Sequence, residues 1–416
     1  MDAGDYVRLR LVDREVEGTL LESHDSSILL VKLKSGYNVG IPKENIHGEE
    51  VLKKHSPVTV KHDIEHKKGL PTIALIMTGG TISSKLDPKT GAVSPLTNVS
   101  EFAKFYPKVF EMANVKIDSP FMKLSENMSH LDWAVLAECV KKYLDDKDVQ
   151  GVIVTHGTDT LHYTSAALSF FLKNLNKPVV LTYSQRSVDR ASSDADLNLR
   201  CAVRMALSDC AEVMLVGHAT MNDDYCNALR GTKVRKMHSS RRDTFKPINC
   251  GPLAKVWPDR VEFSSSFKAR HNGNAELDAS FNDKVALLKF YPGQSPDIID
   301  YYRMHGYKGL VIEMLGLGHV TGGTSEHSWI PALKKAVREG MVICGAAQTI
   351  YGRLDPKVYS TGRELEKAGV IFLEDMLPET AYIKLGWVLG HRGWKTTLKD
   401  KMLDNFAGEL SILLTN

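Results

Sequence analysis

The strongest constraint on the fold of this chain is a regular alternation of short apolar runs with amphipathic segments, which begins at residue 72. Apolar runs of this kind are typical of buried parallel strands, and the amphipathic segments between them indicate helices that cover both faces of a sheet. The pattern predicts a largely parallel, larger α/β domain over residues 72–270. We expect strands at 72–77, 149–155, 179–183 and 213–217, and helices at 130–144, 159–175 and 195–207, the first beginning with a capping box of Ser129 and Asp132.

The same alternation restarts after a polar stretch at residues 271–274. It predicts a second, smaller α/β domain over residues 284–416. The expected strands are 285–291, 310–315, 341–346 and 370–373, and the expected helices are 296–304, 329–339, 363–368 and 379–389.

The first 50 residues have a different pattern, in which short alternating segments are separated by turn residues. These segments, at 6–11, 16–22, 27–33 and 37–42, predict a small β-barrel of the SH3-like kind over residues 1–50. A stretch rich in Lys, His and Glu follows and ends in Pro71. Because it has little apolar periodicity, we interpret residues 51–71 as a connector.

Composition excludes several classes of protein. The formal net charge is +3, from 53 basic and 50 acidic residues, which is too balanced for a chain that holds nucleic acid by charge alone. The first residues lack the pattern of an export signal, and no apolar run approaches the ~20 residues of a membrane span, so we expect a cytoplasmic protein. The six cysteines lack metal-binding spacing, so we expect free thiols and neither a metal nor a cofactor in this chain.

Two loops that follow predicted strands carry hydroxyl groups. In the first, Thr78-Gly79-Gly80-Thr81, two glycines allow a sharp turn that exposes backbone N–H groups and holds Thr81 at the carboxyl edge of the sheet. A phosphate-binding turn or a plain structural turn are the alternatives, although neither GxGxxG nor GxxxxGK[ST] is present.

The second loop, His156-Gly157-Thr158-Asp159-Thr160, opens a predicted helix. Thr158 adds a second hydroxyl and Asp159 a carboxylate, although a simple helix cap would use the same residues. A threonine hydroxyl is a poor nucleophile, so it needs a group that removes its proton. Lys236, in the basic stretch 233–242, is the candidate, and a solvated basic loop is the alternative.

These two loops and Lys236 resemble the signatures of the asparaginase and glutaminase family, from about residue 72 to the C-terminus. The resemblance implies an asparaginase-like fold, a two-domain α/β sandwich. It also implies that Thr81 is the nucleophile that forms an acyl-enzyme. Thr158, Asp159 and Lys236 would form a proton-handling trio, whose aspartate also receives the substrate's α-ammonium group.

The same resemblance implies a substrate site made by Ser125, Glu126 and Gly80, with Ser125 holding the α-carboxylate. Two departures are visible. Many bacterial asparaginases have glutamine where this chain has Glu126, and no tyrosine lies between residues 82 and 100, where they place one on a mobile loop. Thr90 lies in that stretch. The group that deprotonates Thr81 therefore remains open.

The N-terminal extension, with residues 185–187 and 234–245, resembles a branch of this family, the D subunits of archaeal glutamyl-tRNA(Gln) amidotransferases. That resemblance implies a protein that releases ammonia from glutamine or asparagine for conversion of Glu-tRNA(Gln) to Gln-tRNA(Gln). A partner, the E subunit of the amidotransferase, would use ATP and magnesium for the transamidation, and two copies of this chain would form a homodimer within a heterotetramer.

Two other functions are compatible with the sequence. A stand-alone cytoplasmic L-asparaginase would use the same two loops. A non-catalytic RNA or protein adaptor would use the N-terminal barrel and the basic stretch. The cluster from Arg235 to Arg242 could gate a channel, contact a partner or form salt bridges, and residues 351–362 are a candidate source of groups that a neighbouring protomer adds to the site.

Overall fold

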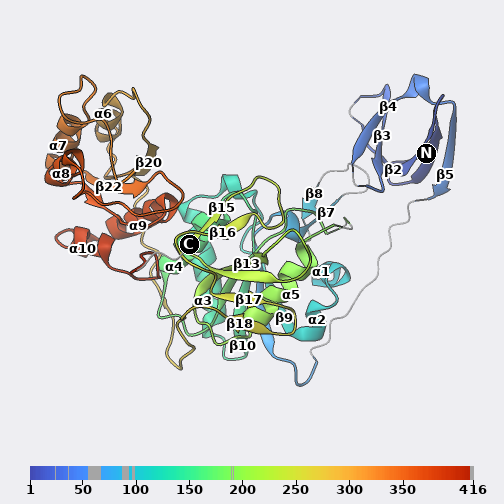
Figure 1. The fold of residues 1–416 in the computed structure, drawn as a ribbon. Helices are drawn as coiled ribbons and strands as arrows, with labels where there is room; N and C mark the ends of the chain where they lie inside the picture. Colours follow the sequence, from blue (N-terminus) through green and yellow to red (C-terminus); the bar gives the residue numbers. More distant parts are fainter. Residues whose placement is uncertain are drawn as a thin grey trace.

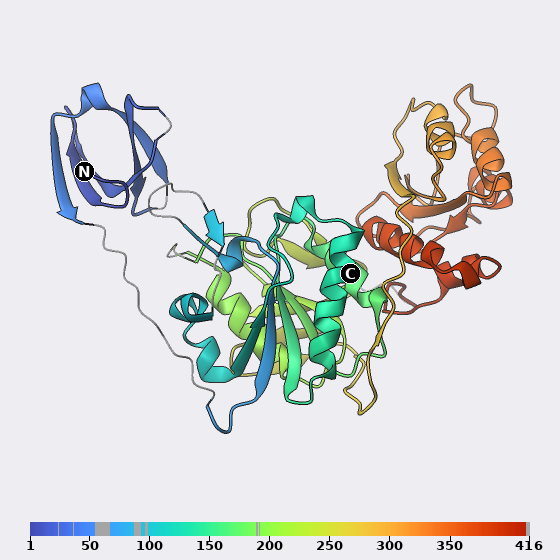
Figure 2. The ribbon, with the colours of Figure 1, turned by 180° about the vertical axis from the view of Figure 1, so that it is seen from behind.

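The computed structural model of the chain describes residues 1–23, 25–35, 37–54, 67–86, 93–95, 99–188, 190 and 192–412. In Figures 1 and 2 a small N-terminal unit and a C-terminal unit lie on opposite sides of a larger central one. Among the described residues, no helix has the length and apolar character needed to span a bilayer.

The N-terminal unit is a rolled antiparallel sheet around the buried side chains of Val7, Leu9, Leu20, Val31 and Ile41. Its strands are β1 (Tyr6–Arg10), β2 (Glu15–Leu21), β3 (Ile28–Leu33), β4 (Asn38–Pro42) and β5 (Gly48–Lys53), in the order β4-β3-β2-β1-β5. The four predicted strands are confirmed. The fifth, β5, crosses the boundary predicted at residue 50, because its mostly exposed Glu and Lys side chains hide the strand pattern.

The central unit contains one eight-stranded sheet, with the order β18-β17-β14-β13-β12-β10-β6-β9. Its strands β6 (Thr72–Met77), β9 (Asn114–Asp118), β10 (Val149–Thr155), β12 (Val179–Thr182) and β13 (Val213–His218) are parallel. The four predicted parallel strands, at 72–77, 149–155, 179–183 and 213–217, are confirmed, and β9 is a further parallel strand that the sequence pattern did not indicate. Sequence patterns missed the antiparallel extension, whose short strands are β14 (Cys226–Arg230), β17 (Ala254–Val256) and β18 (Val261–Phe263).

Two hydrophobic layers hold helices on the two faces of this sheet. Alternate residues of β6 face opposite layers, with Ala74 and Ile76 on one side and Ile73 and Leu75 on the other. Helices α3 (His130–Asp145) and α4 (Leu161–Phe171) cover the first face, and α1 (Val99–Phe105), α2 (Val109–Met112) and α5 (Ala195–Ala206) the second.

The predicted capping box at the start of α3 is confirmed, since Ser129 N donates to Asp132 Oδ2 at 2.8 Å. The predicted helix 159–175 is too long at both ends. It begins at Leu161, and after Phe171 the chain leaves the helix as β11 (Leu172–Lys173), which pairs with β19 (Glu276–Leu277). That pairing joins segments far apart in the chain, so local periodicity could not reveal it.

The C-terminal unit is a four-stranded parallel sheet with helices, as predicted. Its strands are β20 (Val285–Lys289), β21 (Gly309–Met314), β22 (Val342–Ala347) and β23 (Ile371–Phe372), and its helices are α6 (Asp297–Met304), α7 (Ile330–Arg338), α8 (Ser360–Lys367), α9 (Pro378–Gly390) and α10 (Leu398–Leu403). Helix α8 begins three residues before the predicted start at 363, directly after extended Tyr359.

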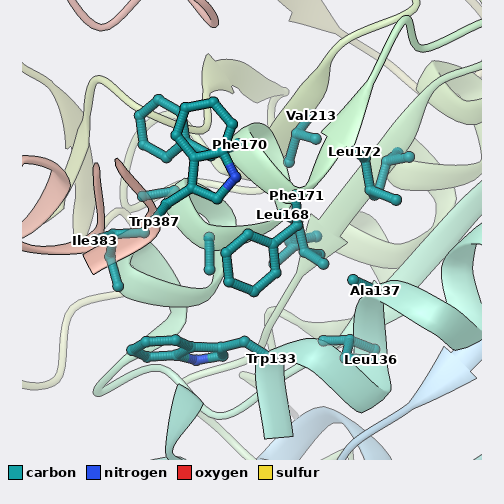
Figure 3. Close-up of a cluster of buried hydrophobic side chains, with 14 of the residues drawn as sticks. Trp133, Leu136, Ala137, Leu168, Phe170, Phe171, Leu172, Val213, Ile383 and Trp387 are labelled. Carbon is teal, nitrogen blue, oxygen red and sulfur yellow. The ribbon is translucent and has the colours of Figure 1, made fainter. Parts of the chain in front are cut away.

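Helix α9 joins the C-terminal unit to the central one. Its Trp387 ring stacks on Phe170 of α4 with 5.5 Å between the ring centroids. Figure 3 shows these two residues in one cluster with Trp133, Phe171 and Ile383. The two α/β units therefore share an apolar core.

The remaining short elements are β7 (Ser84–Leu86), β8 (Val93–Pro95), β15 (Val234–Lys236), β16 (Phe245–Pro247), and the 3-10 turns η1 (Lys43–Asn45), η2 (Thr81–Ser83), η3 (Ser125–Asn127) and η4 (Arg392–Trp394).

Candidate active site

The two threonine loops lie side by side at the carboxyl edge of the central sheet. Strands β6 and β10 are neighbours, and Met77 pairs with Thr155 at their carboxyl ends. A Cβ atom added to Gly80, which has a φ of 81°, would lie 2.6 Å from the backbone nitrogen of Gly157. Gly79 has a φ of 122°, and its Cβ would lie 2.3 Å from the carbonyl oxygen of Lys123. Both glycines are therefore required by backbone conformation and by close packing.

Thr81 begins the turn η2, directly after Gly80. Its backbone is held in place because the buried Tyr106 hydroxyl donates to the carbonyl oxygen of Ile82 at 2.7 Å. The Thr81 residue is half-buried, and its hydroxyl has no hydrogen-bond partner among the described residues. A fixed backbone with a free hydroxyl is the arrangement that a nucleophile needs. Thr90, the other candidate near this loop, lies outside the described residues.

The structure brings Lys236, Thr158 and Asp159 into contact. The Lys236 ammonium donates to Thr158 Oγ1 at 2.8 Å and to Asp159 Oδ1 at 2.7 Å. The Lys236 side chain is only 13% exposed, whereas that of Asp159 is 64% exposed. Lys236 is carried by β15, so the trio joins a loop of the main sheet to a separate two-stranded hairpin.

A buried hydrogen-bond chain supports the second loop, and sequence reasoning missed it. Trp133 Nε1 donates to Thr164 Oγ1 at 3.1 Å, and Thr164 in turn lies 2.9 Å from His156 Nε2. His156 Nδ1 lies 2.7 Å from the Gly157 carbonyl oxygen. Burial lowers the pKa of His156 to about 4, so the ring is neutral and can donate through Nδ1 while accepting through Nε2. These hydrogen bonds fix the backbone just before Thr158.

The predicted substrate residues Ser125 and Glu126 differ in their environments. Ser125 is buried, and a Cβ on Gly157 would lie 2.8 Å from its Oγ atom. Thr160 Oγ1 donates to the Ser125 carbonyl oxygen at 2.7 Å, which ties turn η3 to the second loop. Ser125 therefore lies at the junction with Gly80 and Thr158, whereas the side chain of Glu126 is exposed.

The basic stretch around Lys236 is largely paired with acidic groups. Arg235 lies 2.9 Å from Glu379, Arg241 lies 2.8 Å from Asp243, and Arg242 lies 2.7 Å from Asp223. These contacts favour the salt-bridge interpretation of the stretch. Lys246 adds a further pair with Asp243.

The groups of the site can both activate a nucleophile and stabilise a negative charge. The site contains two hydroxyls, an ammonium and a carboxylate. In addition, the backbone N–H of Thr158 has no acceptor in the part of the chain that the structure describes. It is thus available to an oxyanion. No group of three or more His, Cys, Asp or Glu side chains among the described residues is arranged to hold a metal ion. All six cysteines are free thiols.

Three family descriptions match successive parts of the chain. Residues 1–52 match the GatD N-terminal domain, residues 72–268 match the asparaginase N-terminal domain, and residues 284–402 match the glutaminase/asparaginase C-terminal domain. The predicted asparaginase-like fold is therefore confirmed. The L-asparaginase of Thermococcus kodakarensis has a similar structure, with 29% sequence identity and a TM-score of 0.73, over 82% of this chain and 99% of that one.

Relatives that share the N-terminal extension are similar over the whole chain. The glutamyl-tRNA(Gln) amidotransferase D subunit of Pyrococcus furiosus is 48% identical over 99% of this chain and 95% of the relative. The protein of the same name from Methanothermobacter thermautotrophicus is 42% identical over 99% of this chain and 94% of the relative. This chain belongs to the family of glutamyl-tRNA(Gln) amidotransferase D subunits, in which an asparaginase-type enzyme carries an additional N-terminal domain.

Proposed function

We propose that this chain is the glutaminase-type component of a glutamyl-tRNA(Gln) amidotransferase, and that it releases ammonia from the side-chain amide of glutamine or asparagine. The observation that carries the chemistry is the placement of Lys236 within hydrogen-bond distance of both Thr158 and Asp159. The full-length similarity to D subunits carries the assignment of that chemistry to tRNA-dependent amidation.

In the proposed mechanism, the Thr81 oxygen attacks the amide carbon and forms a tetrahedral intermediate. The carbon–nitrogen bond then breaks, which leaves an ester on Thr81, and the proton that leaves Thr81 ends on the departing ammonia. Attack by water on the ester regenerates Thr81 and gives glutamate or aspartate. Two steps of this kind replace one difficult displacement by two easier ones.

The trio would move the protons in both steps. The contact between Lys236 Nζ and Thr158 Oγ1 gives the protons a path. As the neutral amine, Lys236 would take the Thr81 proton through the Thr158 hydroxyl during the attack, and as the ammonium it would return that proton by the same path to the leaving nitrogen. The free N–H of Thr158 would stabilise the negative oxygen of the tetrahedral intermediate. Asp159 would bind the α-ammonium group of the substrate, and Ser125 its α-carboxylate, with Glu126 and Gly80 completing the substrate site.

The ammonia would go to a partner, the E subunit of the amidotransferase, which activates Glu-tRNA(Gln) with ATP and magnesium. The name of the relatives supports a complex with other subunits. We propose two copies of this chain in a heterotetramer with two partner subunits, working in the cytoplasm, where Glu-tRNA(Gln) is made. The barrel (residues 1–50) and the larger catalytic domain (residues 72–270) would be separate functional units linked by residues 51–71. The smaller domain (residues 284–416) would complete the enzyme.

A stand-alone L-asparaginase is the second candidate, because the two α/β units resemble a solved L-asparaginase. Ammonia release separates the two functions. For the amidotransferase component we expect slow release from glutamine by the chain alone and faster release when partner, ATP and Glu-tRNA(Gln) are added. Fast release from asparagine that is insensitive to all three would instead identify a stand-alone asparaginase. Absence of release under every condition would contradict both and leave the adaptor hypothesis.

A further inference from the structure

The strand that carries Lys236 has little support from its own sheet. Among the strands that the structure describes, β15 pairs only with β16, through Val234↔Pro247, Arg235↔Lys246 and Lys236↔Phe245. An isolated two-stranded ladder is marginally stable. Because the proposed reaction needs Lys236 within hydrogen-bond distance of Thr158, other contacts must hold β15 in place.

On one side, the hairpin packs against the central unit. Val234 is buried in the shared apolar core. The Phe245 ring lies against Tyr183 with 4.7 Å between centroids. Directional contacts to the central unit act on the loop between β15 and β16 and on β16: the Tyr183 hydroxyl donates to the Arg242 carbonyl oxygen at 2.8 Å, Arg242 lies 2.7 Å from Asp223, and Lys246 Nζ donates to the Ala219 carbonyl oxygen at 3.3 Å. None of these three contacts involves a residue of β15 itself.

On the other side, two ion pairs join the hairpin to the start of α9. Lys233 Nζ donates to Asp375 Oδ2 at 2.5 Å and to the Asp375 carbonyl oxygen at 3.1 Å, and both side chains are almost fully buried. Arg235 Nε lies 2.9 Å from Glu379 Oε1. Figure 1 shows β15 on the side of the central unit nearest to α9. We call these two ion pairs the β15 clamp.

The alternation of an extended strand explains the arrangement. Lys233 and Arg235 extend toward one side and Val234 and Lys236 toward the other. Glu379 is the second residue of α9, and Asp375 lies in the turn three residues before its first residue, Pro378, so the start of α9 and the turn that leads into it hold the two cations. A shift of α9 relative to the central sheet would therefore move β15 and, with it, Lys236.

We propose that Arg235 is a positioning residue: through Glu379, and together with the Lys233–Asp375 pair, it holds β15 so that Lys236 stays in contact with Thr158. This inference rests on the proposed amide hydrolysis. It makes the activity of the site in the central unit depend on the docking of the C-terminal unit. A partner that displaces α9 would change turnover without touching the site.

The Arg235–Glu379 pair gives the sharper test. Removing one member of the buried Lys233–Asp375 pair would leave an uncompensated charge and destabilise the whole protein. Glu379→Gln keeps the size of the side chain and removes only its charge, and Arg235→Lys keeps the charge and loses the planar guanidinium group. Both changes are expected to give folded protein.

In the ammonia-release assay with the full chain, we expect Glu379→Gln and Arg235→Met to lower kcat by about 10- to 100-fold while KM for glutamine stays nearly constant. The double variant should lose no more than the larger single effect, because both changes break one interaction. Arg235→Lys should recover part of the kcat lost in Arg235→Met. A variant that fails to fold by circular dichroism is replaced in the comparison by the other member of the pair.

Asp278→Asn is the matched control. Asp278 pairs with Lys173, and the exposed fractions of these two side chains, 17% and 33%, are similar to those of Glu379 and Arg235, 8% and 26%. The control pair lies at the other end of α9, where Asp278 also contacts His391. The control should lower the melting midpoint and leave kcat unchanged. If the clamp variants behave like the control, with lower stability and unchanged kcat, the inference is wrong. Absence of ammonia release by the unmodified chain would instead refute the proposed function, so the two failures are distinguishable.

Discussion

Replacing Lys236 with methionine removes the ammonium group that contacts both Thr158 and Asp159. The bond to Asp159 should contribute little, because that carboxylate is 64% exposed and water and salt screen it. The bond to Thr158 Oγ1, at 2.8 Å from a lysine only 13% exposed, should carry most of the effect. Loss of a proton-transfer group lowers the rate by about 10²- to 10⁴-fold. This corresponds to roughly 3–5 kcal/mol of activation free energy.

The assay is ammonia release from glutamine and asparagine at saturating substrate, with urea unfolding measured in parallel. We expect kcat to fall by that factor. The free energy of unfolding should change by less than about 1 kcal/mol, because methionine retains the apolar stem of the side chain. Thr158→Ala should have an effect of the same order, and the double variant should be no worse than the poorer single one. A Lys236→Met enzyme with near-normal kcat would refute the trio.

Three further predictions concern the loops around the trio. Gly80→Ala should lower activity at least about 100-fold, because the new Cβ atom would lie 2.6 Å from the Gly157 nitrogen. The control is Gly293→Ala, which has nearly the same φ of 82° but nothing within 4 Å of the new Cβ atom, so it should lose stability and keep its activity. Equal activities of the two variants would contradict the close packing of the loops. In steady-state kinetics, Ser125→Ala should raise KM for glutamine by about tenfold or more, with a smaller change in kcat. An unchanged KM would show that Ser125 does not belong to the substrate site. The pKa of His156 is about 4 in the folded state and about 6.5 in the unfolded state, so the unfolded state binds more protons and stability present above pH 6.5 is lost as the pH falls toward 4. Between pH 7 and pH 5, His156 alone should therefore lower the free energy of unfolding by about 2 kcal/mol. Urea unfolding at both pH values measures this change, and a flat profile would contradict the burial of a neutral ring.

Four of the five parallel strands could be predicted because each is a mostly apolar run, whereas β9 has polar residues at three of its five positions and gives no such signal. Buried strands such as Val149–Thr155 have a strong local signal. The antiparallel strands could not be predicted in this way: Val261–Phe263 is short and mostly exposed, so it has too few apolar positions to show a period. The early end of α4 depends on the Leu172↔Leu277 pairing, which no local pattern encodes.

The candidate site shows the same division. Thr81, Thr158 and Lys236 could be proposed because glycine loops after strands and a lysine in an unusually basic stretch are visible in the sequence. The groups that hold them could not. Trp133 and Thr164 are 31 residues apart in the chain, and Lys233 and Asp375 are 142 apart. Such contacts follow from the packing of helices on the sheet rather than from spacing along the chain.

The central claim is that Thr81 is the nucleophile that releases ammonia from a side-chain amide. The most direct test compares the unmodified chain with Thr81→Ala in ammonia release from glutamine and asparagine, with partner, ATP and Glu-tRNA(Gln) present, after circular dichroism has shown that both are folded. We predict release by the unmodified chain and a loss of at least about 1,000-fold in the variant. Release by Thr81→Ala at a rate close to that of the unmodified chain would contradict the account.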